Sequence, residues 1–219
     1  MLNSLNLFGL KVISLKKRML CSLFMLAASA SAYSAPKTVL VLGDSLSAEY
    51  GLTRGSGWVA LLEKRMQAEK IDAKVVNASI SGETTSGGRS RLPALLNQHR
   101  PDIVVIELGA NDGLRGQPVA AAEANLRNMI EMASQNKARV LLVGMRMPPN
   151  YGREYTERFF GMYKALSAKY KAPLVPFMLE GVADKPKLFQ SDRLHPSAEA
   201  HPIILANIWP TFAALVKAR

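Results

Sequence analysis

Short apolar runs alternate with amphipathic stretches over most of this chain, from about residue 38 to residue 217. Brief runs rich in β-branched residues are typical of buried strands, and we predict five of them, at residues 38–42, 74–77, 103–108, 140–145 and 174–175. Apolar residues spaced three or four positions apart predict helices at roughly 57–70, 86–99, 119–136, 153–171 and 202–217. The pattern is therefore one of alternating strands and helices.

This alternation predicts a parallel sheet, because each helix carries the chain back over the sheet in a right-handed crossover. We expect a three-layer α/β/α fold of the flavodoxin-like type, with about five parallel strands in the order 2-1-3-4-5. Ligands of such sheets bind beyond the carboxyl ends of the strands, where the strand order reverses. The loops that follow the first three strands are therefore the places to look for chemistry.

The first 32 residues follow a different pattern. Four basic residues within positions 11–18 precede an apolar stretch at 19–30, and small residues at 30–32 provide a cleavage site. This layout is typical of a secretory signal peptide, and the apolar stretch is well short of the ~20 residues that a membrane anchor needs. We predict a cleaved signal peptide at residues 1–32 and a single domain at residues 33–219, with cleavage after Ala30 or Ala35 as alternatives.

Removal of this segment would change the composition. The one cysteine, Cys21, would be lost, so the mature chain would have no disulfide even in an oxidising compartment. Four of the 28 basic residues would be lost as well, leaving 24 against 17 acids and lowering the formal charge from +11 to +7. The remaining basic residues are scattered, so we expect no nucleic-acid partner and at most peripheral contact with a membrane.

Four loops carry residue types suited to catalysis. The first strand leads into Gly43-Asp44-Ser45, the second into residues 77–84, and the third into Gly109-Ala110-Asn111-Asp112. A later loop, at residues 191–196, holds an aspartate and a histidine three positions apart. Each motif alone is common turn chemistry. Together, in this order and on these loops, they resemble the serine, glycine, asparagine and histidine blocks of the SGNH, or GDSL, hydrolase family.

The resemblance covers nearly the whole chain, from about Lys37 to Val216. Within the family, residues 77–82, 91–96, 107–116 and 148–152 are similar to the periplasmic multifunctional esterases of Gram-negative bacteria. The resemblance implies a serine esterase that hydrolyses esters and thioesters of fatty acyl groups, of the arylesterase, lysophospholipase and thioesterase type. It implies a monomer in the periplasm or outside the cell, with a small acyl ester or a lysophospholipid as its substrate.

The resemblance also assigns roles to five residues. Ser45 would be the nucleophile, His195 the general base and then the general acid, and Asp192 the carboxylate that orients the imidazole. The backbone N–H groups of Ser45 and Gly82 and the side-chain amide of Asn111 would form the oxyanion hole. These residue types suit the reaction, because a serine hydroxyl attacks only when an oriented imidazole takes its proton.

The segment after the fourth strand, residues 145–152, resembles a substrate loop of the related esterases. Its Met147, Pro148 and Tyr151 are candidate substrate-binding residues, because apolar side chains at the rim suit an alkyl chain. The sequence leaves open the alternative that this segment is a helix-entry loop packed on the core. Glu49, where relatives commonly have glycine, is a candidate to change the preference for acyl groups.

Three other acids are expected to support the structure. Asp44 and Asp112 would brace their loops through backbone hydrogen bonds, and Glu107, inside an apolar strand, would be a buried, hydrogen-bonded acid. Three scattered histidines, with no cysteine after residue 32, give no metal-ligand spacing, so we expect no metal and no cofactor.

Two alternative functions are open to such a chain. One is an SGNH deacetylase that removes O-acetyl groups from carbohydrate or peptidoglycan. The other is a binding module on a flavodoxin-like fold, which the combined presence of Ser45, Gly82, Asn111 and His195 disfavours because a binding protein needs no oriented base.

Overall fold

The structure of the protein is a computed structural model that describes residues 35–218. The predicted signal peptide, including Cys21, lies outside these residues. The chain from Pro36 onward forms one compact unit. No helix within the described residues is both long enough and apolar enough to cross a membrane.

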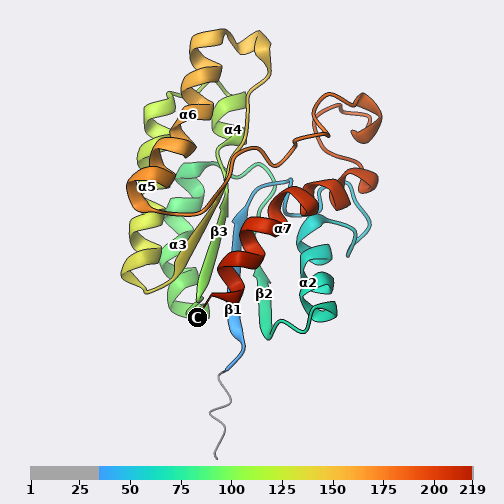
Figure 1. Cartoon of the computed structure of the whole chain (residues 1–219). Coiled ribbons are helices and arrows are strands. Elements are labelled where there is room, and N and C mark those ends of the chain that lie inside the picture. Colours follow the sequence, from blue (N-terminus) through green and yellow to red (C-terminus); the bar gives the residue numbers. More distant parts are fainter. Residues whose placement is uncertain (1–34, 219) are drawn as a thin grey trace, which may run out of the picture. The chain divides into compact units, whose positions relative to one another are not determined.

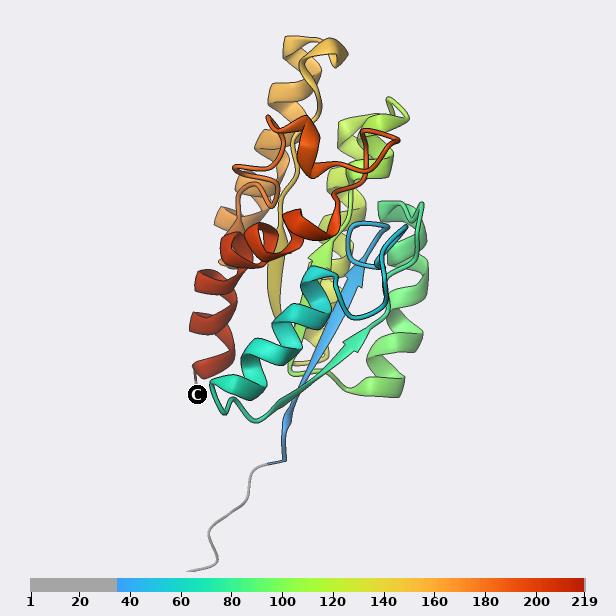
Figure 2. The ribbon, with the colours of Figure 1, turned by 90° about the vertical axis from the view of Figure 1, so that its right-hand side faces the viewer.

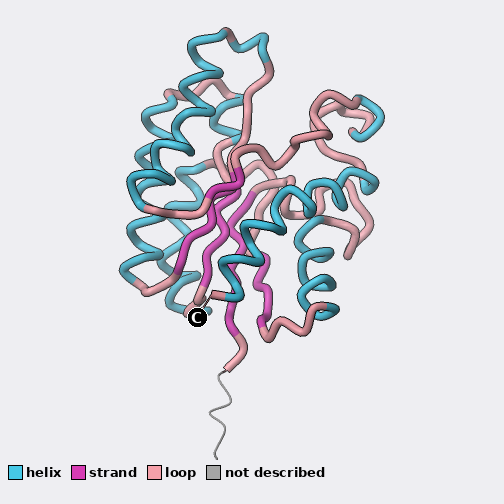
Figure 3. Tube along the Cα trace, viewed as in Figure 1, coloured by secondary structure: helices cyan, strands magenta, loops and turns pink. Residues whose placement is uncertain are grey.

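A parallel sheet of five strands forms the middle layer of this unit (Figures 1 and 3). The strands follow the order β2-β1-β3-β4-β5, so the predicted fold class and strand order are confirmed. Their ends lie within two residues of the predicted ones: β1 Lys37–Gly43, β2 Ala73–Asn77, β3 Ile103–Glu107, β4 Arg139–Val143 and β5 Leu174–Val175.

Helices cover both faces of the sheet. Figure 1 shows α2 (Trp58–Ala68) and α7 (His201–Lys217) together on one face, and Figure 2 views this face from the front. The other face is covered by α3 (Thr85–His99), α5 (Val119–Gln135) and α6 (Arg153–Tyr170). Four short elements were not predicted, because each has too few residues for a periodic pattern: α4 (Ala110–Leu114) and 3₁₀ turns at Pro149–Tyr151, Pro186–Leu188 and Ala198–Ala200.

The central strand β1 explains why the site lies where it does. Its residues from Val39 to Leu42 are fully shielded from solvent, because β2 and β3 flank it and helices cover both of its faces. β1 pairs with β3 so that Gly43 is directly opposite Glu107. The loops after β1, β2 and β3 therefore leave the sheet at the same edge, and the serine, glycine and asparagine blocks meet there.

The opposite edge of the sheet, where the strands begin and the helices end, shows one repeated backbone feature. Four helices are followed by a basic residue in the left-handed backbone region: Lys70 after α2 (φ 54°), Arg100 after α3 (φ 43°), Lys137 after α5 (φ 63°) and Lys171 after α6 (φ 53°). A positive charge suits the carboxyl end of a helix dipole. The backbone conformation, in contrast, is one that glycine adopts more easily.

Gly144, directly after β4, provides a test of how tightly the sheet is packed at the edge where the site loops leave it. A Cβ atom at Gly144 would lie 2.4 Å from the carbonyl oxygen of Pro176. Because that neighbour is backbone and cannot turn aside, we expect Gly144→Ala to lower the free energy of unfolding by about 2 kcal/mol. Urea denaturation followed by circular dichroism would measure the change.

Gly161 is the matched control, because it lies within α6 with open space around its Cβ position. Gly161→Ala should raise the free energy of unfolding by roughly 0.5–1 kcal/mol, since alanine favours the helix and restricts the unfolded chain. Equal effects of the two substitutions would contradict the packing argument.

Candidate active site

Ser45 lies in the turn that follows β1. Asp44 shapes this turn: its carboxylate accepts a hydrogen bond from the N–H of Leu46 (3.0 Å), and its carbonyl accepts from the N–H of Ser47 (3.2 Å). The side-chain amide of Asn77, at the end of β2, donates to the carbonyl of Ser47 (2.8 Å). The turn is thereby fixed both internally and to the neighbouring strand.

His195 connects Ser45 with Asp192. Its Nε2 atom lies 2.9 Å from Oγ of Ser45, and its Nδ1 atom lies 2.7 Å from Oδ2 of Asp192. When Nδ1–H donates to the carboxylate, Nε2 is free to accept the proton of the serine hydroxyl. Hydrogen bonds from the backbone N–H and the imidazole of His195, and then from the N–H of Leu194, lower the pKa of Asp192 to about 2. The carboxylate is therefore ionised at neutral pH.

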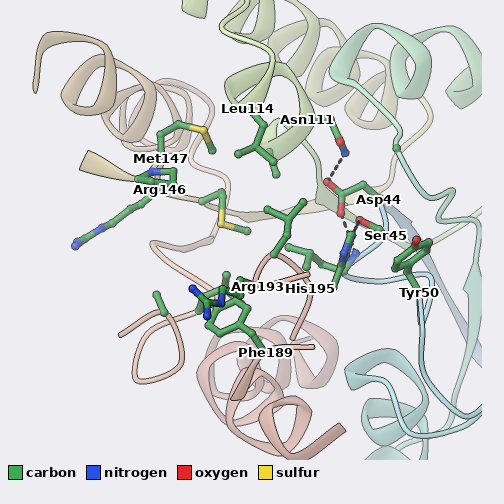
Figure 4. Close-up of a pocket in the computed structure, with 18 of the residues that line it drawn as sticks. Asp44, Ser45, Tyr50, Asn111, Leu114, Arg146, Met147, Phe189, Arg193 and His195 are labelled. Carbon is green, nitrogen blue, oxygen red and sulfur yellow. Dashed lines mark hydrogen bonds between the residues drawn. The ribbon is translucent and has the colours of Figure 1, made fainter. Parts of the chain in front are cut away.

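The loop that carries Asp192 and His195 is held in place by Gln190. The backbone N–H of Gln190 donates to the carbonyl of His195 (2.8 Å), and its side-chain amide donates to the carbonyls of Tyr50 (2.8 Å) and Pro196 (3.0 Å). The ring of Tyr50 also lies against the imidazole of His195, with 4.4 Å between the centroids (Figure 4). These contacts connect the histidine loop to the loop after β1.

The residues predicted to form an oxyanion hole line the same cavity as the serine. Within residues 35–218 the backbone N–H groups of Ser45 and Gly82 donate no hydrogen bond, and both residues line the same cavity. Gly82 has a φ of 77°, which a side chain would strain. The amide nitrogen of Asn111 donates to Oδ2 of Asp44 (3.1 Å) and to the carbonyl of Glu83 (2.9 Å) (Figure 4). These two bonds fix the amide between the Ser45 turn and the loop after β2.

Two buried acids lie here, Asp44 within the turn and Glu107 beneath it. Glu107, in β3, accepts a hydrogen bond from Oγ of Ser47 (2.7 Å), and Nε1 of Trp58 donates to the same hydroxyl (3.1 Å). Burial raises the pKa of Glu107 well above its usual range, and the nearby charge of Asp44 raises it further. Burial also raises the pKa of Asp44, to about 6. The predictions that Glu107 is a buried acid and that Asp44 braces its loop are confirmed.

The segment that carries Asn111 is fixed by α6 and by the 3₁₀ turn that precedes it. Three tyrosine hydroxyls donate to carbonyls of this segment: Tyr163 to Leu108 (2.9 Å), Tyr155 to Gln117 (2.8 Å) and Tyr151 to Leu114 (2.8 Å). Asp112 accepts hydrogen bonds from the backbone N–H (2.8 Å) and the hydroxyl (2.6 Å) of Thr85, so it braces its loop as expected. The asparagine therefore lies on a rigid support, although it is on a short helix and not in the predicted loop.

A cavity of about 700 Å³ opens beside Ser45 and His195 (Figure 4). Gly82, Asn111 and two of the predicted substrate residues, Met147 and Pro148, also line this cavity. Most of its remaining walls are apolar. Met145 belongs to the predicted substrate segment 145–152. The others were not predicted, because they come from separate parts of the chain without a shared motif: Leu114, Phe177, Leu179, Ala183 and Phe189.

Two candidate residues lie away from this cavity. Tyr151 is not among the lining residues, and its hydroxyl holds the Asn111 segment instead. Glu49 is also absent from the lining, and its carboxylate accepts hydrogen bonds from the N–H groups of Gly55 (3.0 Å) and Gly57 (2.7 Å). Its φ of 59° explains why glycine suits this position. Glu49 therefore closes its own loop and is not part of the cavity wall.

Comparison with known proteins identifies the family. A sequence profile of the GDSL-like Lipase/Acylhydrolase family matches residues 41–203. The chain belongs to this family. Esterase TesA of Pseudomonas aeruginosa is 51% identical over 183 residues, which cover 84% of this chain and 91% of the relative. Thioesterase 1/protease 1/lysophospholipase L1 of Escherichia coli K12 is 45% identical over 171 residues, which cover 78% and 81%.

A solved structure agrees with this assignment. A crystal structure of TesA aligns with a TM-score of 0.80 at 51% identity and covers 82% of this chain and 99% of its own. The predicted family and the predicted enzyme class, a serine ester hydrolase of the GDSL type, are confirmed. The deacetylase alternative is not favoured, since these relatives are named as esterase or thioesterase.

The site offers no set of metal ligands. Among residues 35–218 there is no group of three or more histidine, cysteine, aspartate or glutamate side chains that could hold a metal ion. The chemistry that the arrangement can perform is acyl transfer, because it combines a hydroxyl, an oriented imidazole and free backbone donors around one cavity.

The raised pKa of Asp44 makes stability depend on pH. Between pH 3.8 and about 6 the folded protein holds more protons at Asp44 than the unfolded chain does, so the wild type loses stability as the pH rises through this window. Asp44→Asn removes this titration. We expect the unfolding free energy of the variant, minus that of the wild type, to increase from pH 3.8 to about 6 and to level off above. Urea denaturation across this range would test the sign, and a difference that falls with pH would contradict it.

Proposed function

We propose that this GDSL hydrolase cleaves esters and thioesters of fatty acyl groups through an acyl-enzyme formed on Ser45. The observation that carries the proposal is the hydrogen-bonded series Asp192–His195–Ser45 at the mouth of an apolar cavity. The names of the relatives, an esterase and a thioesterase with lysophospholipase activity, support this choice of substrate. An apolar cavity of this size suits an alkyl chain.

The geometry supports a two-step reaction. Oγ of Ser45 attacks the acyl carbon while Nε2 of His195 takes the hydroxyl proton, and Asp192 stabilises the imidazolium that results. His195 then gives this proton to the departing alcohol or thiol. In the second step His195 takes a proton from water, the hydroxide attacks the acyl-serine, and the fatty acid leaves as the proton returns to Oγ of Ser45.

The negative oxygen that forms in each step would be held by three donors. The backbone N–H groups of Ser45 and Gly82 are free to bind it, whereas the amide of Asn111 already donates to Asp44 and Glu83. Asn111 would share one of its hydrogens with the oxyanion. Such preorganised donors act mainly on the transition state, because charge develops only there.

The protein is further proposed to act outside the cytoplasm. Residues 1–32 would be removed as a signal peptide, and residues 33–219 would form the single mature domain, which lies in the periplasm or is secreted. A monomer is proposed, since all five proposed catalytic residues come from one chain.

Replacement of the nucleophile gives the most direct test. Ser45→Ala should lower the hydrolysis of p-nitrophenyl esters by at least about 10⁴-fold and leave the circular dichroism spectrum and the melting temperature unchanged. Ser81→Ala is the control, because Ser81 lines the same cavity but makes no hydrogen bond to His195. Retention of more than about a few per cent of the activity would exclude Ser45 as the nucleophile.

A chain-length series with the wild type tests the substrate class at the same time. Activity should improve from acetate toward medium-chain esters, because longer chains fill more of the apolar cavity. If the acetate ester were hydrolysed fastest, the deacetylase alternative would be favoured instead.

The Asn111→Ala variant tests whether this amide contributes to catalysis or to substrate binding. We expect the turnover number to fall by about 10²–10³-fold with a smaller change in the Michaelis constant, because the amide binds the oxyanion and not the ground state. Asp192→Ala should be milder than either Ser45→Ala or Asn111→Ala. A change confined to the Michaelis constant would make Asn111 a ground-state binding residue.

A further inference from the structure

The large apolar side chains that residues 35–218 expose lie on loops that lead to the site cavity. Residues 35–218 expose three large apolar side chains, Tyr50, Ile80 and Leu194, each 47–50% exposed. Each lies on a loop that carries a proposed catalytic group: Tyr50 follows the Ser45 turn, Ile80 precedes Gly82 by two residues, and Leu194 directly precedes His195. Tyr50 and Leu194 line the mouth of the cavity themselves. Single exposed apolar residues need no explanation, but three around one opening indicate an interaction surface.

Positive charge accompanies these side chains, and the guanidinium of Arg146 also lies over the ring of Phe160, 4.2 Å from the centroid. Arg146 and Arg193 line the cavity, and Nη2 of Arg115 donates to the carbonyl of Gly82 (3.2 Å). All three arginines are exposed, and none takes part in an ion pair within the described chain.

The acids on the same loops offset this charge only in part, because the three arginines outnumber the two carboxylates without a cationic partner, Glu49 and Asp192. Glu49 accepts backbone hydrogen bonds of its own loop, Glu83 is paired with Arg91, and Asp192 is engaged by His195. Asp44 and Glu107 are buried. The rim of the cavity is therefore both apolar and cationic.

We propose that this rim docks on the surface of an anionic lipid bilayer. Tyr50, Ile80 and Leu194 would enter the boundary between headgroups and acyl chains, where tyrosine and aliphatic side chains partition well, and the three arginines would bind lipid phosphates. The inference rests on the proposed function in one respect, namely that the cavity receives an acyl chain. Docking in this orientation lets that chain pass from the bilayer into the cavity without crossing water.

The opposite edge of the sheet distinguishes this proposal from general charge attraction. Lys70, Arg100, Lys137 and Lys171 follow the helices at that edge, so it too is cationic. It carries none of the three exposed large apolar side chains. If net charge alone attracted the protein to a membrane, cations at either edge would matter equally.

Sedimentation with lipid vesicles would test the docking surface. The mature protein with Ser45→Ala would be used, so that no lipid is hydrolysed, with vesicles of phosphatidylcholine alone or mixed with phosphatidylglycerol. We expect binding to the mixed, anionic vesicles and little to the zwitterionic ones. Added Arg193→Glu should weaken this binding by about tenfold, and added Ile80→Ser by about fivefold.

Lys137→Glu is the matched control for Arg193→Glu. Both residues are exposed cations in the left-handed backbone region, with φ of 63° and 55°, so the two charge reversals carry similar backbone strain at opposite edges of the sheet. We expect Lys137→Glu to change vesicle binding by less than about twofold. Equal losses for the two variants, or no binding to anionic vesicles, would overturn the proposal.

A water-soluble ester separates this inference from the proposed function. Ile80 does not line the cavity, so Ile80→Ser in the otherwise wild-type enzyme should hydrolyse p-nitrophenyl butyrate at the wild-type rate. Hydrolysis of this ester by the wild type without vesicle binding would exclude docking and leave the proposed function intact. Vesicle binding without hydrolysis would exclude the function and leave the docking surface intact.

Discussion

The buried hydrogen bonds beneath the Ser45 turn are the constraint on which the rest of the site depends. β1 and β3 are neighbours in a register that sets Gly43 opposite Glu107, and the carboxyl group of Glu107 then meets Ser47. A Cβ atom at Gly43 would lie 2.8 Å from Oε2 of Glu107, so glycine is what permits this approach. A buried acid without partners would be costly. The pairing of two strands thus determines where the turn, and with it Ser45, can lie.

Hydrogen bonds from side-chain amides connect the loops of the site to one another. Asn77 joins the loop after β2 to the Ser45 turn, Asn111 joins the segment after β3 to the loop after β2, and Gln190 joins the histidine loop to the loop after β1. Each amide donates to a backbone carbonyl. A residue of any type provides such a carbonyl, so these hydrogen bonds do not depend on the side chain at the accepting position. The loops can therefore vary in sequence while the distances between the proposed catalytic groups are kept.

The features that could be predicted from the sequence are those that depend on a local pattern of residues. The strands were recognised from β-branched runs, and Ser45, Gly82, Asn111 and His195 from motifs on the loops that follow those strands or precede the last helix. The short helix α4 was missed because five residues show no periodicity. The roles of Tyr151 and Glu49, and walls such as Phe177 and Phe189, depend on contacts between distant segments, which no local pattern encodes.

The basic residues that follow α2, α3, α5 and α6 have a consequence for how this enzyme can adapt. A non-glycine residue in the left-handed region costs roughly 1 kcal/mol, and four such residues lie at the edge of the sheet away from Ser45. Changes there would alter resistance to heat without displacing a group involved in acyl transfer. Selection on these four residues can therefore change thermal tolerance while turnover is held constant.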